Sequence, residues 1–447
     1  MSIKFIHAAD LHIDSPFRGL EAQSERIAAK LRRATRDAFE TLVDQAIDED
    51  VAFVVVAGDV FDGDWDNTET GLWTSNQFKR LTDASIPVFV VYGNHDKKSR
   101  LIANLGFPKS VKVFSSSAAE RAIYPDDFPE LAERGIVERV AITGRSYAAS
   151  ECSEDLAASY PDAEPNAFNI GVLHTALGGE GADNYAPTTV TTLQSKGYDY
   201  WALGHVHQRR TIATSPCWIG YSGVLQGRHA NEVDPKGYYL VEVEEGRLVG
   251  EPEFRSVDVF RWARVKVDVS GAETEEELKS LFRETMEDVV SRAENRNVAA
   301  RVAFSGRTPL YGLLHKKREE NDFNAFFLDV LSEFADCLWI QEYELKELSP
   351  PIPESAWNQG VLGDVKRDVD GVIRALVKES QEGLELGSEA GKDNVQPILD
   401  LGVRLGGDAL RYLRDSSDES AFDPLSSRQV AQWCERALEI LANGLVK

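Results

Sequence analysis

The sequence has few cysteines and no long apolar run. Its four cysteines lie far apart and form no CxxC pair, so neither a disulfide framework nor a zinc ribbon is predicted. The first residues lack the apolar run of a signal peptide, and no stretch reaches the roughly 18 consecutive apolar residues of a membrane span. Low-complexity tracts and internal repeats are also lacking. We therefore expect a folded cytoplasmic protein that makes no membrane contact.

Positive charge is scarce as well. The 447 residues include 49 lysines and arginines against 74 aspartates and glutamates, which gives a formal net charge of -25. Such a charge repels polyanions at long range and argues against a protein that coats nucleic acid through a general basic surface. Any contact with nucleic acid must therefore be local.

The spacing of apolar residues predicts an α/β fold over about the first 100 residues. Strands alternate there with amphipathic helices, the pattern of a layered α/β domain. We expect strands at 3–8, 51–57 and 87–92 and helices at 24–49, with Ser24 as N-cap, and at 68–82. Shorter strands are expected at 139–144, 169–174, 198–203, 218–221 and 238–243, with a turn and a return strand after the last.

The pattern changes near residue 258. Strands at 265–269, 299–304 and 338–345 and a charged amphipathic helix at 274–293 predict a small α/β domain with its own core. A proline-rich stretch, 349–353, then has the composition of a stiff linker. Only helices are predicted beyond it, at 361–385, 395–414 and 427–445. We therefore predict three regions, residues 1–257, 258–348 and 349–447.

Aspartates, asparagine and histidines follow five of the predicted strands. In chain order the segments are Asp10-Leu11-His12, Gly58-Asp59-Val60-Phe61-Asp62, Gly93-Asn94-His95-Asp96, His174 and Gly204-His205-Val206-His207. In α/β folds the loops at the carboxyl ends of strands bind ligands. Any one of these motifs alone is more often a hydrogen-bonded turn or a core histidine than a ligand. Because five of the eight histidines fall in these segments, we favour one shared site.

Converging carboxylates and imidazoles predict a metal centre. Without a cation between them, the buried carboxylates would repel one another. Carboxylate, amide and imidazole ligands suit manganese, iron or zinc. Two ions need about eight ligand positions, which seven residues supply if Asp59 bridges both ions. The predicted ligands are Asp10, His12, Asp59, Asn94, His174, His205 and His207. We expect two divalent ions, with manganese favoured.

The order DxH, GDxxD, GNHD, strand-end His and GHxH resembles the calcineurin-like metallophosphoesterases over about residues 3–210. The resemblance implies a β-sandwich flanked by helices, with both metals at one end of the sheets. Two segments, 5–17 and 221–237, resemble more narrowly the bacterial DNA repair nucleases of the YhaO and SbcD type. By that resemblance residues 258–348 are a capping domain that covers the active site and guides DNA. The C-terminal helices would dock an SMC-like coiled-coil ATPase of the SbcC or YhaN kind, and a homodimer is expected.

The resemblance also implies how the ligands are divided. Asp10, His12, Asp59 and His207 should hold one metal, and Asp59, Asn94, His174 and His205 the other. His95 has no ligand position and is expected beside the scissile phosphate, as an imidazolium that stabilises the transition state or protonates the leaving oxygen. We predict that Asp96 orients the His95 ring, with a hydrogen bond in the turn as the alternative.

Three further residues lie in or near these segments. Asp62 stands where part of the wider nuclease family has a second histidine, and a carboxylate there repels phosphate, which leaves endonuclease activity open. His7 is expected in the core or behind the ligands, and His229 in a loop near the substrate.

Several basic residues flank the motif loops. They are positioned to contact backbone phosphates locally in an acidic chain, although ordinary solvated surface explains each one equally well. The predicted substrate contacts are Arg18, Lys97, Lys98, Arg209, Arg210 and Arg228.

Three functions are compatible with the sequence. The first is a metal-dependent DNA exonuclease of DNA repair that works with an ATPase. The second is a phosphodiesterase or phosphatase acting on a nucleotide or phosphoprotein, because the metal site alone sets no substrate class. The third is a non-catalytic adaptor of the ATPase, which the complete ligand set disfavours.

Overall fold

The computed structural model describes residues 2–15, 25–63, 67–98, 106–128, 134–178 and 185–351. Its contacts divide the chain into two units, Met1–Gly306 with Leu313–Leu348, and Arg307–Gly312 with Ser349–Lys447. The three helices predicted after residue 360 and Arg18 lie outside the described residues, as do Ser24 and Cys434. Within the described ranges, no helix is long and apolar enough to cross a bilayer.

The first sheet has seven strands and contains the N-terminal strand near its centre. Its order is β12-β11-β1-β2-β3-β4, and β13 also pairs with β11. The pairs β1·β2, β2·β3 and β3·β4 are parallel, whereas β11 is antiparallel to β1. The strands are β1 (Ile3–Ala8), β2 (Phe53–Ala57), β3 (Val88–Val91), β4 (Val111–Val113), β11 (Gly237–Glu244), β12 (Arg247–Leu248) and β13 (Glu253–Ser256).

The second sheet has six strands in the order β5-β6-β7-β8-β10-β9. The central pairs β6·β7, β7·β8 and β8·β10 are parallel, and the outer pairs are antiparallel. The strands are β5 (Glu120–Tyr124), β6 (Val140–Gly144), β7 (Phe168–His174), β8 (Tyr200–Gly204), β9 (Arg210–Ala213) and β10 (Trp218–Tyr221).

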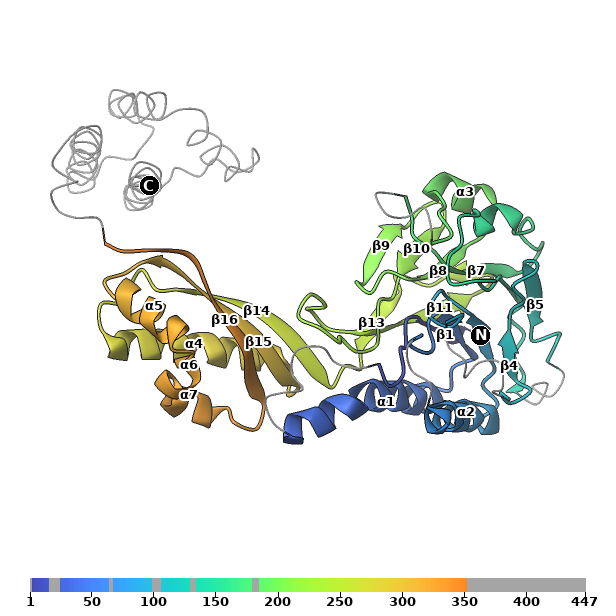
Figure 1. Cartoon of the computed structure of the whole chain (residues 1–447). Coiled ribbons are helices and arrows are strands. Elements are labelled where there is room, and N and C mark those ends of the chain that lie inside the picture. The colour runs from blue at the N-terminus through green and yellow to red at the C-terminus, as the bar shows by residue number, and fades with distance from the viewer. Residues whose placement is uncertain are drawn as a thin grey trace, which may run out of the picture. The chain divides into compact units, whose positions relative to one another are not determined.

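The two sheets pack face to face around an aromatic and aliphatic core. Phe5 and Phe53 stack with centroids 5.0 Å apart, and the Tyr200 ring of the second sheet meets Phe5 edge-on. On the outer face of the first sheet lie α1 (Glu25–Asp48) and α2 (Thr68–Asp83), as Figure 1 shows. The second sheet is covered by the 3-10 helix η3 (Leu156–Ser159) and by α3 (Val190–Ser195). The predicted β-sandwich flanked by helices is confirmed.

A three-stranded sheet follows the sandwich in the chain. Parallel β14 (Phe260–Asp268) and β15 (Asn297–Arg307) pair, and β16 (Leu338–Ser349) lies beside β15. The helix α4 (Glu275–Arg292) begins with a capping box of Thr274 and Glu277, and its Phe282 stacks on Phe327 at 4.1 Å. Three short helices precede β16, namely α5 (Tyr311–Glu319), α6 (Phe323–Phe326) and α7 (Leu328–Glu333).

Candidate metal centre

The predicted ligands come from the carboxyl ends of five strands. Strands β1, β2 and β3 run parallel in one sheet, and β7 and β8 run parallel in the other, so each group of loops emerges at one edge. Within the first sheet, Asp10 N–H donates to Gly58 O at 2.9 Å. The Asp10 side chain joins the two sheets, because its Oδ1 atom accepts from His205 N–H at 3.1 Å. The loops therefore form one site, and the ligand residues meet there.

Several of these residues have backbone angles that side chains rarely adopt. The φ angles are 50° at Asp10, 42° at His12, 50° at Asp59 and 99° at His205. Such angles cost of order 1–3 kcal/mol each and cluster at functional sites, where the surrounding structure enforces them. The loops also approach one another closely at Gly93, where a Cβ atom would collide with Asp59 Oδ1 and with the His174 ring.

One group of ligand atoms is formed by Asp10, His12 and His207, which lie within 4.8 Å of one another. The Nε2 atoms of His12 and His207 face each other at 3.2 Å, and His12 Nε2 lies 3.8 Å from Asp59 Oδ2. Two imidazole nitrogens at this distance either share one proton or direct both lone pairs at one cation. The neighbouring carboxylates of Asp10 and Asp59 favour the cation, because carboxylate and imidazole together are ligands that suit a divalent metal.

A second group surrounds His174. Its Nε2 atom lies 3.0 Å from Asn94 Oδ1 and 3.4 Å from Asp59 Oδ2, and its Nδ1 atom lies 3.0 Å from Ala57 O. The ring of His205 lies 5.2 Å from that of His174, and Tyr185 stacks on the other side of His205 at 4.6 Å. Asp59 Oδ2 therefore approaches both groups, as a bridging ligand must.

The electrostatics of the site suit cations. Burial lowers the pKa of His174, and burial together with neighbouring histidines lowers that of His205 to about 3, so both rings are neutral and carry a lone pair. Burial lowers the pKa of His12 as well. The pKa of Asp10 is raised by burial and by the charge of Asp59. Neutral imidazoles around repelling carboxyl groups form a donor set that a divalent ion satisfies.

His95 contacts Asp62 rather than Asp96. Its Nδ1 atom lies 3.0 Å from Asp62 Oδ1, and its ring meets His12 edge-on at 5.0 Å. The hydrogen bond to Asp62 raises the pKa of His95 and outweighs the effect of burial. Asp62 is itself held by Ser15 Oγ at 2.7 Å and by Arg228 at 3.1 Å. Burial opposes its ionisation, yet these partners lower its pKa, so it remains a carboxylate.

The prediction that Asp96 orients the His95 ring is wrong. Its Oδ1 atom accepts from Phe61 N–H at 3.0 Å and its Oδ2 atom from Gly93 N–H at 2.9 Å. The buried carboxyl thus satisfies backbone donors of two strand-end loops, which is the turn alternative. Burial and the charge of Asp59 raise its pKa to about 8.

The guanidinium group of Arg228 is bound by other side chains of the site. Its side chain is 11% exposed, and its guanidinium donates to Ser15 Oγ at 2.8 Å and to Asp62. Its charge is therefore engaged by Asp62, and its predicted contact with a substrate phosphate stays a prediction. Arg228 and Asp62 support His95.

Glu232 lies beside His207, and although it belongs to the segment 221–237 that carries the narrower resemblance, the sequence predicted no role for it. Its Oε1 atom lies 2.5 Å from His207 Nδ1, so it fixes the ring with Nε2 turned toward His12. Burial opposes ionisation of Glu232, but the His207 bond and the Arg228 charge lower its pKa to about 2. His229, predicted near the substrate, lies with Nε2 3.3 Å from the same carboxylate.

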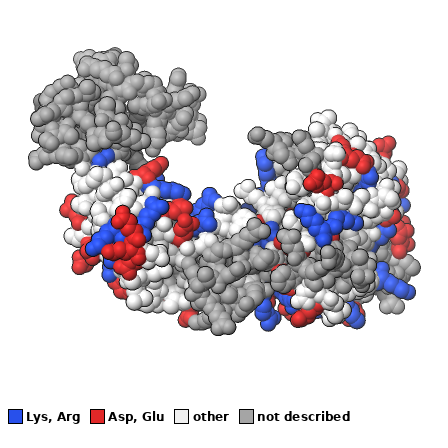
Figure 2. All heavy atoms as spheres, in the orientation of Figure 1, with Lys and Arg blue, Asp and Glu red and all other residues white. Residues whose placement is uncertain are grey.

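The other predicted basic contacts lie on the loops beside the ligands. Lys97 and Lys98 follow His95 in the same turn, and the Lys97 ammonium lies 5.3 Å from the Tyr92 ring centre. Arg209 stacks over Phe254 at 4.0 Å, and Arg210 begins β9 with an exposed side chain. On the face drawn in Figure 2, basic and acidic side chains are interspersed over the described surface. This agrees with local rather than general attraction of polyanions.

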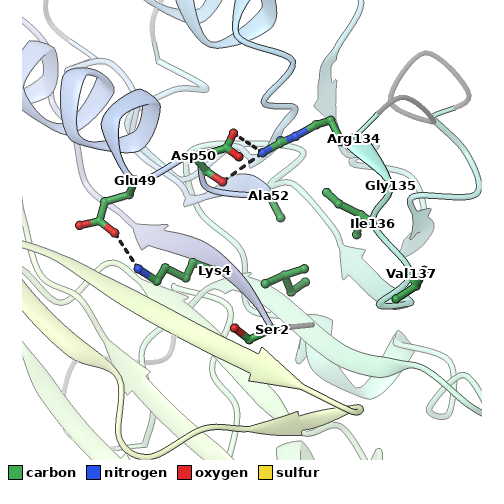
Figure 3. A pocket seen from close by; sticks show the side chains of 10 residues that line it. Ser2, Lys4, Glu49, Asp50, Ala52, Arg134, Gly135, Ile136 and Val137 are labelled. Carbon is green, nitrogen blue, oxygen red and sulfur yellow. Dashed lines mark hydrogen bonds and ion pairs between the residues drawn. The ribbon is translucent and has the colours of Figure 1, made fainter.

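A pocket lies at the start of β1, at the other end of this strand from the candidate ligands. Its volume is about 270 Å³, and its charged residues are paired, Lys4 with Glu49 at 2.7 Å and Arg134 with Asp50 at 2.6 Å (Figure 3). Paired side chains offer no converging ligands. His7, in the middle of β1, is a core residue as predicted, with its ring nitrogens on Tyr200 Oη and Leu203 O.

Comparison with known proteins agrees with this site. Residues 3–209 match the family model of calcineurin-like phosphoesterases, and residues 262–346 match that of the middle domain of metallophosphoesterase YhaO. The chain is 33% identical to metallophosphoesterase YhaO of Bacillus subtilis over 395 residues, which cover 86% of this chain and 90% of that protein. The chain belongs to the calcineurin-like metallophosphoesterases. It is thus a phosphoester hydrolase of a family that uses a dinuclear metal site.

This metallophosphoesterase is also similar to a protein named for DNA double-strand break repair and to a subunit of a nuclease. It is 27% identical to the DNA double-strand break repair protein Mre11 of Methanopyrus kandleri, over 63% of this chain and 62% of that protein. It is 24% identical to one of the subunits of nuclease SbcCD from Staphylococcus epidermidis, over 56% of this chain and 68% of that protein.

Proposed function

We propose that this metallophosphoesterase is a manganese-dependent DNA exonuclease of DNA repair that works in the cytoplasm with an SMC-like coiled-coil ATPase of the SbcC or YhaN kind. The observation that carries the proposed hydrolysis is the position of His95. This histidine lies outside both ligand groups, and its Nδ1 atom lies 3.0 Å from Asp62 Oδ1. The DNA substrate is supported by the relatives named for DNA repair and nuclease activity.

Seven residues would hold the ions. Asp10, His12, Asp59 and His207 would bind one, and Asp59, Asn94, His174 and His205 the other, with Asp59 as the bridge. The apposed His12 and His207 nitrogens and the position of Asp59 Oδ2 between the two groups support this division. When bound, two divalent ions supply the positive charge that lowers the pKa of a water nucleophile and neutralises the phosphodiester.

His95 would then complete the reaction from the protein side. The leaving sugar oxygen needs a proton at neutral pH, and a positioned imidazolium supplies it efficiently. The Asp62 carboxylate raises the pKa of His95 and favours this charged form. Asp62, tied to Arg228 and Ser15, fixes the ring so that its Nε2 atom is free to donate.

The basic residues beside the ligands would contact the DNA backbone. Lys97 and Lys98 lie two and three positions after His95, and Arg209 and Arg210 lie two and three positions after His207. Phosphates next to the scissile bond would therefore meet them. We extend the proposal to residues 258–348 as a capping domain, to the region after residue 349 as the ATPase-docking segment and to a homodimer.

A substrate comparison tests the function. The purified protein is incubated with Mn²⁺ and with single-stranded DNA, double-stranded DNA, cyclic nucleotides or a chromogenic phosphodiester, beside the Asp59→Asn and His95→Ala variants as matched inactive controls. We expect cleavage of DNA from its ends and a loss of at least about 100-fold in both variants. Turnover of the small substrates alone would rule out DNA as substrate. Full activity in both variants would overturn the site assignment.

The partnership has its own test. A coiled-coil ATPase encoded beside this gene is expected to co-purify with the full chain and to change the rate of DNA cleavage when ATP is added. An ATPase that neither binds the full chain nor alters cleavage would remove this part of the proposal.

A further inference from the structure

One loop between β10 and β11 carries a residue that binds Asp62, the partner of His95, and a residue that binds His207. Residues 226–232, called the connecting loop below, contain both Arg228 and Glu232. Arg228 binds Asp62, the partner of His95, and Glu232 binds His207. The Arg228 backbone N–H also donates to Glu232 Oε2 at 2.6 Å, which closes the loop on itself. A displacement of this loop would therefore reach both histidines.

The same loop is bound to β14, the first strand of the small α/β domain. Gln226 Nε2 donates to Phe260 O at 2.6 Å, and Gln226 Oε1 accepts from Val259 N–H at 2.9 Å. The indole N–H of Trp262 donates to Gly227 O at 3.1 Å. Gln226 and Trp262 are 1% and 3% exposed, so water does not compete readily for these bonds.

Strand β14 is in turn fixed to the sandwich by packing. Phe260 and Trp262 join Leu31 and Ala34 of α1 in one buried cluster with Ala230 of the connecting loop. Trp339 of β16 stacks on Phe260 at 5.7 Å and packs against the cluster. The start of β14 is therefore held against α1 by apolar contact, while the hydrogen bonds of Gln226 and Trp262 connect it to the connecting loop.

We propose that β14 positions the reacting groups through the connecting loop, and that Gln226 and Trp262 are positioning residues of the hydrolytic reaction. The path runs from Gln226 and Trp262 to the loop backbone, and from there through Arg228 to Asp62 and His95 and through Glu232 to His207. The small domain thereby sets the geometry of the metal centre in addition to any contact it makes with substrate. The proposal rests on the hydrolytic part of the proposed function and does not require DNA as the substrate.

Two variants test the hydrogen bonds without removing the packing. Trp262→Phe removes the indole N–H and keeps an aromatic ring, whereas Gln226→Leu removes the amide and keeps a similar volume. In the full chain with Mn²⁺ and a chromogenic phosphodiester, we expect kcat to fall about tenfold and KM to change less than about twofold. Titration calorimetry with Mn²⁺ should show a loss of affinity of about threefold or more at one of two sites, that of His207.

Trp339→Phe is the matched control, because Trp339 belongs to the same buried contact and makes no hydrogen bond to the connecting loop. It should lower the melting temperature and leave kcat and Mn²⁺ affinity unchanged. Unchanged kcat and Mn²⁺ affinity in folded Trp262→Phe would overturn the proposal, and so would an equal loss in Trp339→Phe. If the wild-type chain hydrolyses no phosphodiester, the proposed function fails, and the Mn²⁺ titrations alone decide the positioning role.

Discussion

The Nδ1 atom of His95 lies 3.0 Å from the Oδ1 atom of Asp62, three positions after the bridging candidate Asp59. By its charge alone, a carboxylate at position 62 would repel phosphate. In the fold the Asp62 carboxylate is hydrogen-bonded to His95, Arg228 and Ser15. The positive charge of Arg228 therefore offsets its negative charge near the substrate. Asp62 thus binds and orients His95. Repulsion between its carboxylate and phosphate is therefore no longer an argument against endonuclease activity.

Asp62→Asn tests this relationship. The variant loses the charge that favours the imidazolium and one acceptor that fixes the ring, so we expect kcat for a chromogenic phosphodiester to fall about 10- to 100-fold. KM should change little. In the His95→Ala background the same substitution should cost almost nothing more, because the two residues act as one unit. Steady-state kinetics of the four proteins measure this coupling.

Asp199→Asn is the control for that cycle. Asp199 Oδ2 accepts from Asn169 N–H at 2.7 Å, so the substitution makes the same chemical change at a structural hydrogen bond away from the ligands. Its kcat should equal that of the wild type. Additive losses in Asp62→Asn and His95→Ala would show that Asp62 acts independently of the histidine.

Glu232→Gln should weaken metal binding. The carboxylate lies 2.5 Å from His207 Nδ1 and fixes the ring with Nε2 toward His12. Loss of such a partner typically lowers metal affinity about 10- to 100-fold. Calorimetric titration with Mn²⁺ should therefore show one weakened site and one unchanged site. Glu164→Gln, which affects a carboxylate that pairs with Arg121 at 2.9 Å, should bind both ions like the wild type. Equal affinities in both variants would contradict this role of Glu232.

The strand-end positions of the candidate ligands and most strands of the sandwich could be predicted from sequence because local patterns mark them, whereas the sandwich itself was implied by the family resemblance. Strand β2 is an uninterrupted apolar run that is buried on both faces, and its end carries the glycine and aspartate that the tight loop requires. The helix predicted at 24–49 is α1, Glu25–Asp48. Strands β4 and β5 are short and partly exposed, so their composition gave no signal.

The supporting contacts depend on distant pairs and could not be predicted. Arg228 and Asp62 are 166 positions apart in the chain, and no periodicity connects them. The start of β14 was missed for a related reason. Arg261 is a charged residue at a buried strand position, and its ion pairs with Asp258 and Glu294, both at 2.9 Å, make that burial acceptable. The predicted strand therefore began at residue 265, five residues after the observed start at Phe260.

Replacing Lys97 and Lys98 together by alanine should weaken binding of duplex DNA and flatten its salt dependence. Each lysine that neutralises a phosphate contributes about 0.9 to the slope of log affinity against log salt, so the slope should fall by up to about 2. Fluorescence anisotropy over a range of salt concentrations measures it. The paired control, Lys109→Ala with Lys112→Ala, removes the same charge near β4. An unchanged slope in the first pair would exclude both lysines from the DNA contact.

His7 should make the stability of the protein depend on pH. Its ring is fully buried in β1, with Nδ1 2.9 Å from Tyr200 Oη and Nε2 3.1 Å from Leu203 O, and burial lowers its pKa from 6.5 to about 3. Because the folded pKa is the lower one, the unfolded chain binds more protons between these two values. The contribution of the neutral ring is complete above pH 6.5 and declines as the pH falls toward 3.

The expected size follows from that shift. Between pH 6.5 and 5 the wild type should lose about 2 kcal/mol of stability through His7, at about 1.4 kcal/mol per pH unit. His7→Gln removes this titration and retains an amide that can donate to Leu203 O. Urea denaturation at pH 7 and pH 5 gives the difference in unfolding free energy between the two proteins, in which all other titrating groups cancel. That difference should shrink by about 2 kcal/mol at the lower pH, whereas a constant difference would mean that the buried ring titrates near 6.5.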